Sequence, residues 1–167
     1  MLEIEVQADE EWDSSQSWDA LVRGAAEAAI AESDYPHLAS SDRPVELSVR
    51  LTNDADVRAL NDEWRDKDKP TNVLSFPLAE AQDFTRAMIA GPELLLGDIV
   101  IARGVCVAEA SDKGISVEHH VTHLLVHGML HLLSYDHLDD ASADDMEARE
   151  VRALRRLGIA DPYRIAA

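Results

Sequence analysis

Two segments in the first third of the chain, residues 2–7 and 45–51, alternate between hydrophobic and polar residues. Successive side chains of a β-strand point to opposite faces of a sheet, so this period of two predicts two strands, each buried on one face. Residues 72–76 predict a third, short strand that ends at Pro77, because proline cannot donate a hydrogen bond to a neighbouring strand. The largely apolar stretch Leu94–Ala102 predicts a fourth, buried strand.

Hydrophobic positions that recur every three to four residues predict five helices. The first follows Ser17, a suitable N-cap, and ends near residue 33. The second spans residues 54–65, and its period predicts that Trp64 packs inward together with Val57 and Leu60. The remaining three helices are predicted at residues 103–113, 117–133 and 143–157.

The order of these elements predicts a single domain, residues 1–167, of the α/β (α+β) class. We expect a small mixed sheet of about four strands, partly parallel, that packs with about five helices. The roughly fifteen residues after Pro77 carry no clear period, and a loop of that length is often functional or mobile.

The composition limits the partners and the compartment of the protein. The chain has 33 acidic and 15 basic side chains, a formal net charge of −18, which argues against a general attraction to nucleic acid or anionic lipid. An RNA substrate would therefore need a local basic patch. The N-terminus is acidic and no apolar stretch is long enough for a bilayer, so we expect a cytoplasmic protein with no membrane partner. Cys106 is the single cysteine, which excludes an internal disulfide and a cysteine-rich zinc site.

The last predicted helix has acidic residues in its first turns and several arginines toward its end. This distribution is favourable because it complements the helix dipole. We interpret these arginines as a solvent-exposed face rather than a nucleic-acid surface; they are Arg149, Arg152, Arg155 and Arg156.

Six of the seven histidines lie between His119 and His137. His127 and His131 are four residues apart on one predicted helix, which places their side chains about 6 Å apart and allows both rings to bind one ion. His123 is about 12 Å from His131 along the helix axis, too far for a third ligand. His137 follows the predicted end of the helix and completes an H-x3-H-x5-H pattern. The other histidines of this segment are interpreted as core or half-buried residues: His119, His120 and His123.

Three neutral imidazoles with a fourth position left for water are typical of catalytic rather than structural zinc. Gly128 stands where the H-E-x-x-H zinc peptidases carry their glutamate base, so peptide hydrolysis by that mechanism is disfavoured. A glycine inside a helix costs about 1 kcal/mol relative to alanine. We therefore expect a close approach to the backbone at Gly128.

Residues 127–137, HGMLHLLSYDH, resemble the H-G-x-L-H-L-x-G-Y-D-H signature of the YbeY endoribonucleases, the bacterial ribosomal RNA maturation factors. Residues 61–77 and 96–101 resemble two further blocks of this family. The resemblance implies a zinc-dependent, single-strand-specific endoribonuclease that acts in ribosomal RNA processing, with one Zn²⁺ per chain on His127, His131 and His137. Its implied partners are single-stranded ribosomal RNA and the small ribosomal subunit or associated proteins, with no DNA. Two alternatives stay open: a metal-dependent hydrolase of another substrate, and a ribosome-assembly factor with structural zinc.

Three residues near this motif carry further expectations. Arg65 aligns with the arginine of the first family block, so the resemblance makes it the candidate catalytic residue that binds the phosphate. The alternative interpretation is a structural arginine at the end of a helix, where the helix dipole favours a cation. Ser134 replaces the family's usual glycine, and if this position needs the positive φ that a glycine suggests, serine adds about 1 kcal/mol of strain. Asp136 could orient a ligand histidine, act as a general base, or cap the turn.

Overall fold

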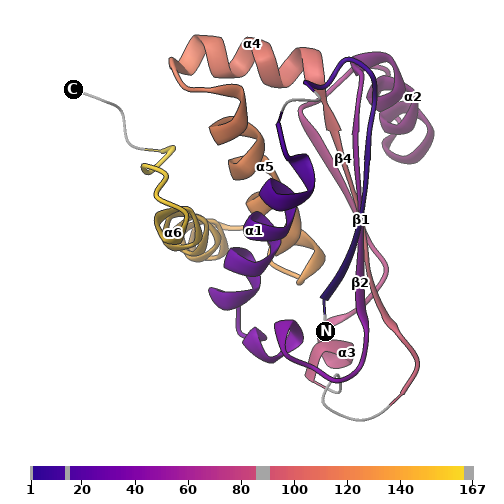
Figure 1. The fold of residues 1–167 in the computed structure, drawn as a ribbon, viewed down its shortest axis with the longest axis vertical. Coiled ribbons are helices and arrows are strands. Elements are labelled where there is room, and N and C mark those ends of the chain that lie inside the picture. The colour runs from indigo at the N-terminus through magenta and orange to yellow at the C-terminus, as the bar shows by residue number, and fades with distance from the viewer. Residues whose placement is uncertain (1, 14–15, 86–90, 164–167) are drawn as a thin grey trace.

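A four-stranded mixed sheet lies at the centre of the molecule in a computed structural model that describes residues 2–13, 16–85 and 91–163 (Figure 1). The strand order is β1-β2-β4-β3, and β3 is antiparallel to β4 whereas the other two pairs are parallel. These strands are β1 (Leu2–Ala8), β2 (Val45–Thr52), β3 (Val73–Pro77) and β4 (Leu94–Ala102). The predicted class, an α/β domain with a mixed sheet of four strands, is confirmed.

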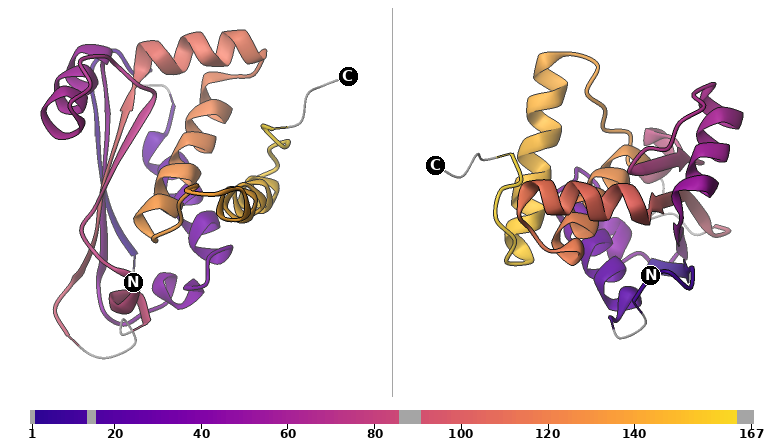
Figure 2. Two further views of the ribbon diagram at one scale, coloured as in Figure 1. Left: turned by 180° about the vertical axis from the view of Figure 1, so that it is seen from behind. Right: turned by 90° about the horizontal axis from the view of Figure 1, so that it is seen from above.

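Helices cover the two faces of the sheet unequally (Figure 2). Only α2 (Asp54–Arg65) lies on one face in the described part of the chain, whereas four further helices lie on the other. That helical layer consists of α1 (Trp18–Ala31), α4 (Arg103–Lys113), α5 (Val117–Leu132) and α6 (Asp140–Arg156). No helix in the described ranges is long and apolar enough to span a membrane.

The main core lies between the sheet and the helices α1 and α5. Most side chains of α5 are buried because the helix has the sheet on one side and α1 and α6 on the others. The close approach expected at Gly128 is confirmed, since a Cβ atom there would lie 3.3 Å from the side chain of Ile99 on β4. The absence of a side chain at Gly128 therefore lets the histidine-bearing part of α5 lie close to Ile99 on the sheet.

The helix boundaries agree with the sequence to within two residues at α1, α2, α4 and α5 but differ elsewhere. The segment after Pro77 contains a short helix, α3 (Ala81–Thr85), so the described residues hold six α-helices rather than five, beside a short 3-10 helix, η1 (Pro36–Ala39). Residues 86–90 of the predicted loop lie outside the described residues. Helix α6 begins three residues earlier than predicted, because Asp139 and Ser142 form a capping box at its start.

The prediction that Trp64 packs inward is wrong. Val57, at the start of the same stripe, is fully buried against the sheet, but the side chain of Trp64 is 66% exposed. Helix α2 has no second helix beside it on this face in the described ranges, so its last turn reaches a part of the sheet that nothing else covers. Trp64 there lines an open hollow of about 430 Å³ together with Leu60 and Phe76.

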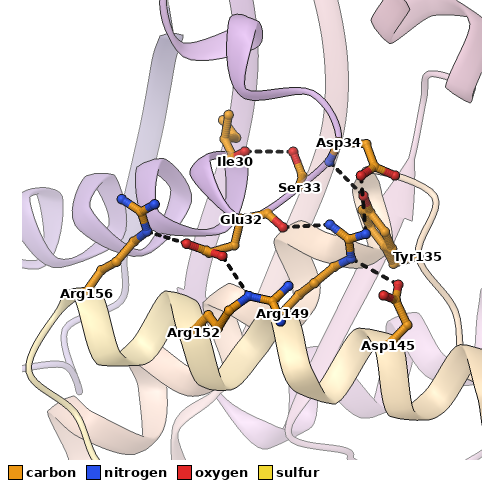
Figure 3. Close-up of polar contacts among 9 residues, drawn as sticks. All are labelled: Ile30, Glu32, Ser33, Asp34, Tyr135, Asp145, Arg149, Arg152 and Arg156. Atoms are coloured by element: carbon orange, nitrogen blue, oxygen red, sulfur yellow. Dashed lines mark hydrogen bonds and ion pairs between the residues drawn. The ribbon is translucent and has the colours of Figure 1, made fainter.

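Three of the four arginines of α6, Arg152, Arg155 and Arg156, are exposed as predicted, but this side of the helix also contacts α1. Arg152 and Arg156 pair with the carboxylate of Glu32, just after α1, at 2.9 and 2.6 Å, and Arg149 donates to the carbonyl oxygen of Glu32 at 2.7 Å (Figure 3). The Arg149 side chain is only 15% exposed. Tertiary packing places α6 beside the C-terminal end of α1, where these cations meet an acidic partner and free carbonyl groups.

Candidate metal centre

Two consecutive turns of α5 present His127 and His131 on the same side of the helix. The helix begins at a Ser116 cap that accepts a hydrogen bond from the backbone of His119, which fixes the register of the turns that follow. The Nε2 atoms of His127 and His131 lie 3.0 Å apart. Both side chains are therefore close enough to bind one ion.

The turn after α5 returns the chain to these two rings. Ser134 has φ 76°, the positive φ that the family's glycine suggests at this position, and the backbone N–H of Tyr135 donates to the carbonyl oxygen of Leu130 at 3.0 Å. The carboxylate of Asp136 caps the turn by accepting the backbone N–H of His137 at 2.7 Å. The structure thereby brings one nitrogen atom from each of His127, His131 and His137 within 4.8 Å of one another.

Hydrogen bonds at Nδ1 set the tautomers of the two helical histidines. His127 donates from Nδ1 to the carboxylate of Glu150 at 2.7 Å, and His131 donates from Nδ1 to the carbonyl oxygen of Tyr135 at 3.0 Å. Neither acceptor can donate, so in the neutral rings both Nε2 atoms carry lone pairs that face each other. Lone pairs at this distance repel unless a cation lies between them, and two ligands of tetrahedral zinc are about 3.3 Å apart. The donor set therefore fits a metal ion.

His131 is also held in the protonation state that metal binding requires. Burial, together with the neighbouring ring of His127, lowers the pKa of His131, which keeps its imidazole neutral at neutral pH.

Glu150 on α6 is a residue of the site that the sequence interpretation missed. Its carboxylate is only 1% exposed and accepts hydrogen bonds from His127 and from the hydroxyl of Tyr163, both at 2.7 Å. Burial opposes ionisation, but hydrogen bonds from His123 and His127 outweigh it and lower the pKa of Glu150 to about 2. The available signal was a lone acidic residue on the buried side of α6, which otherwise presents Met146, Ala153 and Leu154.

The remaining histidines of α5 lie outside the cluster. His119 is exposed, whereas His120 is buried and pairs with Glu109 at 2.9 Å. His123 is buried beside Tyr163, with 3.2 Å between its Nε2 atom and the hydroxyl oxygen. His123 therefore lies behind the cluster and contacts the carboxylate of Glu150, which also holds His127.

The clustered histidines line an open cavity of about 560 Å³. Arg65, the last residue of α2, reaches this cavity past the edge strand β3 and donates to the carbonyl oxygen of Ser75 at 3.4 Å. Among the described residues of the cavity wall, Arg65 is the single arginine or lysine. The structure thus places the predicted arginine and the three predicted histidines around one space.

The family model described as "Endoribonuclease YbeY" matches residues 3–158 of the 167-residue chain. The chain belongs to the YbeY family. Endoribonuclease YbeY of Sphingopyxis alaskensis is 49% identical over 165 residues, which cover 98% of each chain. Endoribonuclease YbeY of Rhizorhabdus wittichii is 47% identical over 167 residues, covering 99% of this chain and 98% of that one. These relatives therefore match the chain over nearly its whole length.

The solution structure of TM1509 from Thermotoga maritima is also similar. It has a TM-score of 0.54 and 20% sequence identity, and the superposition covers 99% of this chain and all of that one. At this identity the likeness shows the fold alone. The match to the YbeY family model includes the three clustered histidines, Arg65 and Glu150, whereas Tyr163 lies beyond its last matched residue.

Proposed function

We propose that this protein is a zinc-dependent, single-strand-specific endoribonuclease that acts in ribosomal RNA processing. The observation that carries the proposal is the convergence of three imidazoles and one arginine on a single open cavity, in a chain of the YbeY family. The inferred partners are single-stranded ribosomal RNA and the small ribosomal subunit with its associated proteins. The proposed compartment is the cytoplasm.

One Zn²⁺ per chain would be held by His127, His131 and His137. Three imidazoles without a cysteine are a zinc set that leaves room for a fourth ligand, and these three open onto the cavity. When bound, zinc activates water for attack and withdraws charge from a phosphoryl oxygen. Glu150 and the carbonyl of Tyr135 bind Nδ1 of two of the rings, which leaves their Nε2 atoms to hold the ion.

Arg65 is the proposed phosphate-binding catalytic residue. The chain carries a net charge of −18, so an RNA backbone would be repelled except where a cation is available locally. A guanidinium can bind two phosphate oxygens at once and stabilise the charge that develops during cleavage. The contact of Arg65 with the Ser75 carbonyl leaves further N–H groups of the guanidinium for the substrate.

Metal content tests the ligand set. His137→Ala removes a proposed ligand and should lose zinc, whereas His123→Ala should retain it because His123 lies outside the cluster. The measurement is zinc per chain by elemental analysis after gel filtration. The opposite pattern, zinc lost from His123→Ala and kept by His137→Ala, would show that the ligand set is wrong.

Single-turnover cleavage tests the activity. Arg65→Lys should cut single-stranded ribosomal RNA more slowly with zinc content intact, because a point charge cannot replace the planar guanidinium. Arg58→Lys is the matched control, since Arg58 lies on the same helix and pairs with Asp68 instead. Full activity of Arg65→Lys would remove Arg65 from the mechanism. If the wild-type protein holds zinc and binds small ribosomal subunits but cuts no RNA, it is an assembly factor. If it cleaves another class of substrate instead, it is a different metal-dependent hydrolase.

A further inference from the structure

The side chain of Tyr135 is fixed at the junction of α1 and α6 (Figure 3). Its hydroxyl oxygen accepts the backbone N–H of Asp34, just beyond α1, at 2.9 Å. The guanidinium of Arg149 from α6 lies over its ring, 4.6 Å from the ring centre. These contacts join residues 34, 135 and 149. Residue 34 lies more than a hundred positions before the other two in the sequence.

Arg149 is itself held in one orientation. Its three donor nitrogens each have an oxygen partner: the Glu32 carbonyl at 2.7 Å, Asp34 at 3.2 Å and Asp145 at 3.0 Å. A planar guanidinium can satisfy all three partners while its flat face stays on the Tyr135 ring. The Tyr135 ring is therefore clamped by the Arg149 guanidinium, a mostly buried group whose three nitrogens are all hydrogen-bonded.

The backbone of Tyr135 has a separate role, because its carbonyl oxygen accepts the Nδ1–H of His131 at 3.0 Å. The hydrogen bond at one ring nitrogen decides which nitrogen carries the proton. If the carbonyl moves away, the proton can shift to Nε2, and the nitrogen that faces His127 and His137 is then blocked. The position of the Tyr135 backbone thus controls whether His131 is available as a ligand.

We propose that Arg149 is a positioning residue for His131 and acts through Tyr135. By clamping the tyrosine ring, Arg149 keeps the tyrosine carbonyl on Nδ1 and so keeps Nε2 of His131 free for a metal ion. This positioning role rests on the proposed zinc site. The adjacent residue of α6, Glu150, holds His127 directly, so one turn of α6 orients two of the three histidines.

The chain provides a matched control in Arg152. Arg152 lies one turn further along α6 and pairs with Glu32 at 2.9 Å, as part of the same ionic network. None of its interactions within the described residues involves Tyr135. Arg149→Lys and Arg152→Lys therefore both weaken the contact between α1 and α6, but only the first removes the guanidinium from the tyrosine ring.

The experiment measures the His131 tautomer and the zinc affinity in the same set of proteins. Long-range ¹H–¹⁵N spectra of the metal-free protein at about pH 8, where imidazoles are neutral, report which ring nitrogen is protonated. Competition with a chelator gives the zinc affinity. Arg149→Lys should show His131 partly protonated at Nε2 and a roughly tenfold weaker zinc affinity, within the range for groups that orient metal ligands. Arg152→Lys should match the wild type in both measurements.

Tyr135→Ala provides a second route, since it keeps the carbonyl but removes the ring that Arg149 clamps. It should weaken zinc binding at least as much, and adding Arg149→Lys to it should cause no further loss. Equal zinc affinities and equal tautomers in Arg149→Lys and Arg152→Lys, or additive losses in the double variant, would overturn the positioning role. If the wild type binds no zinc, the proposed site fails, and the tautomer of metal-free His131 still decides whether Arg149 positions this ring.

Discussion

The buried charge of Glu150 makes a quantitative prediction about the stability of the metal-free protein. The pKa of this carboxyl falls from its usual 4.5 to about 2 in the folded chain, despite burial, because His123, His127 and Tyr163 hydrogen-bond to it. A lowering of this size corresponds to roughly 3 kcal/mol in favour of the folded state when the group is ionised. Glu150→Gln keeps the size of the side chain and removes the charge, so it should lower the free energy of unfolding at pH 7 by up to that amount.

The sign of the pH dependence follows from the direction of the shift. The folded chain holds Glu150 ionised where the unfolded chain would protonate it, so the stabilisation is fully present above about pH 4.5 and is lost as the pH falls toward about 2. Urea denaturation of metal-free wild type and Glu150→Gln between about pH 3 and pH 7 measures this difference. The gap between the two proteins should narrow below about pH 4.5, because protonated glutamic acid resembles glutamine.

The control for Glu150 is Glu147, an exposed acid on the same helix. Glu147→Gln should change the free energy of unfolding by less than about 0.5 kcal/mol at every pH, as expected for an exposed surface position. A gap between wild type and Glu150→Gln that is as large at about pH 3 as at pH 7 would refute the reasoning. The loss would then come from packing or hydrogen-bond geometry and not from the charge.

Three further predictions concern the fold. Ser134→Gly should raise the melting temperature of the metal-free protein, because relief of the positive φ of 76° is worth up to about 1 kcal/mol; a lower melting temperature would contradict this strain. Gly97→Ala should lose at least about 2 kcal/mol in urea denaturation, since a Cβ atom there meets the carbonyl oxygen of Phe76 and φ is 141°; unchanged stability would contradict the close strand contact. Burial raises the pKa of the Cys106 thiol to about 12, so iodoacetamide should label it only after unfolding, and rapid labelling of the native protein would show that the thiol is accessible.

Local patterns in the sequence determined the elements of this fold and part of its site. The alternation at residues 45–51 predicted β2 because a strand turns its side chains to opposite faces whatever lies beside it. The spacing of His127 and His131 placed the two rings together because one turn of helix separates them. Gly128 indicated a close contact because glycine destabilises a helix whatever surrounds it, so its presence there points to a neighbour that leaves no room for a side chain. Each inference uses geometry that is contained within a few residues of chain.

Only the tertiary structure decided which groups meet across the chain. The exposure of Trp64 depends on the absence of a second described helix on that face of the sheet, which the period of α2 cannot report. Glu150 stands out in the sequence only as an acid on the apolar side of its helix, and its buried contact with His127 exists because α6 packs beside α5. Arg149 meets Tyr135 for the same reason. Periodicity specifies which side of an element is buried, but the partner on that side is set by how the elements pack, since the interacting atoms are far apart along the chain.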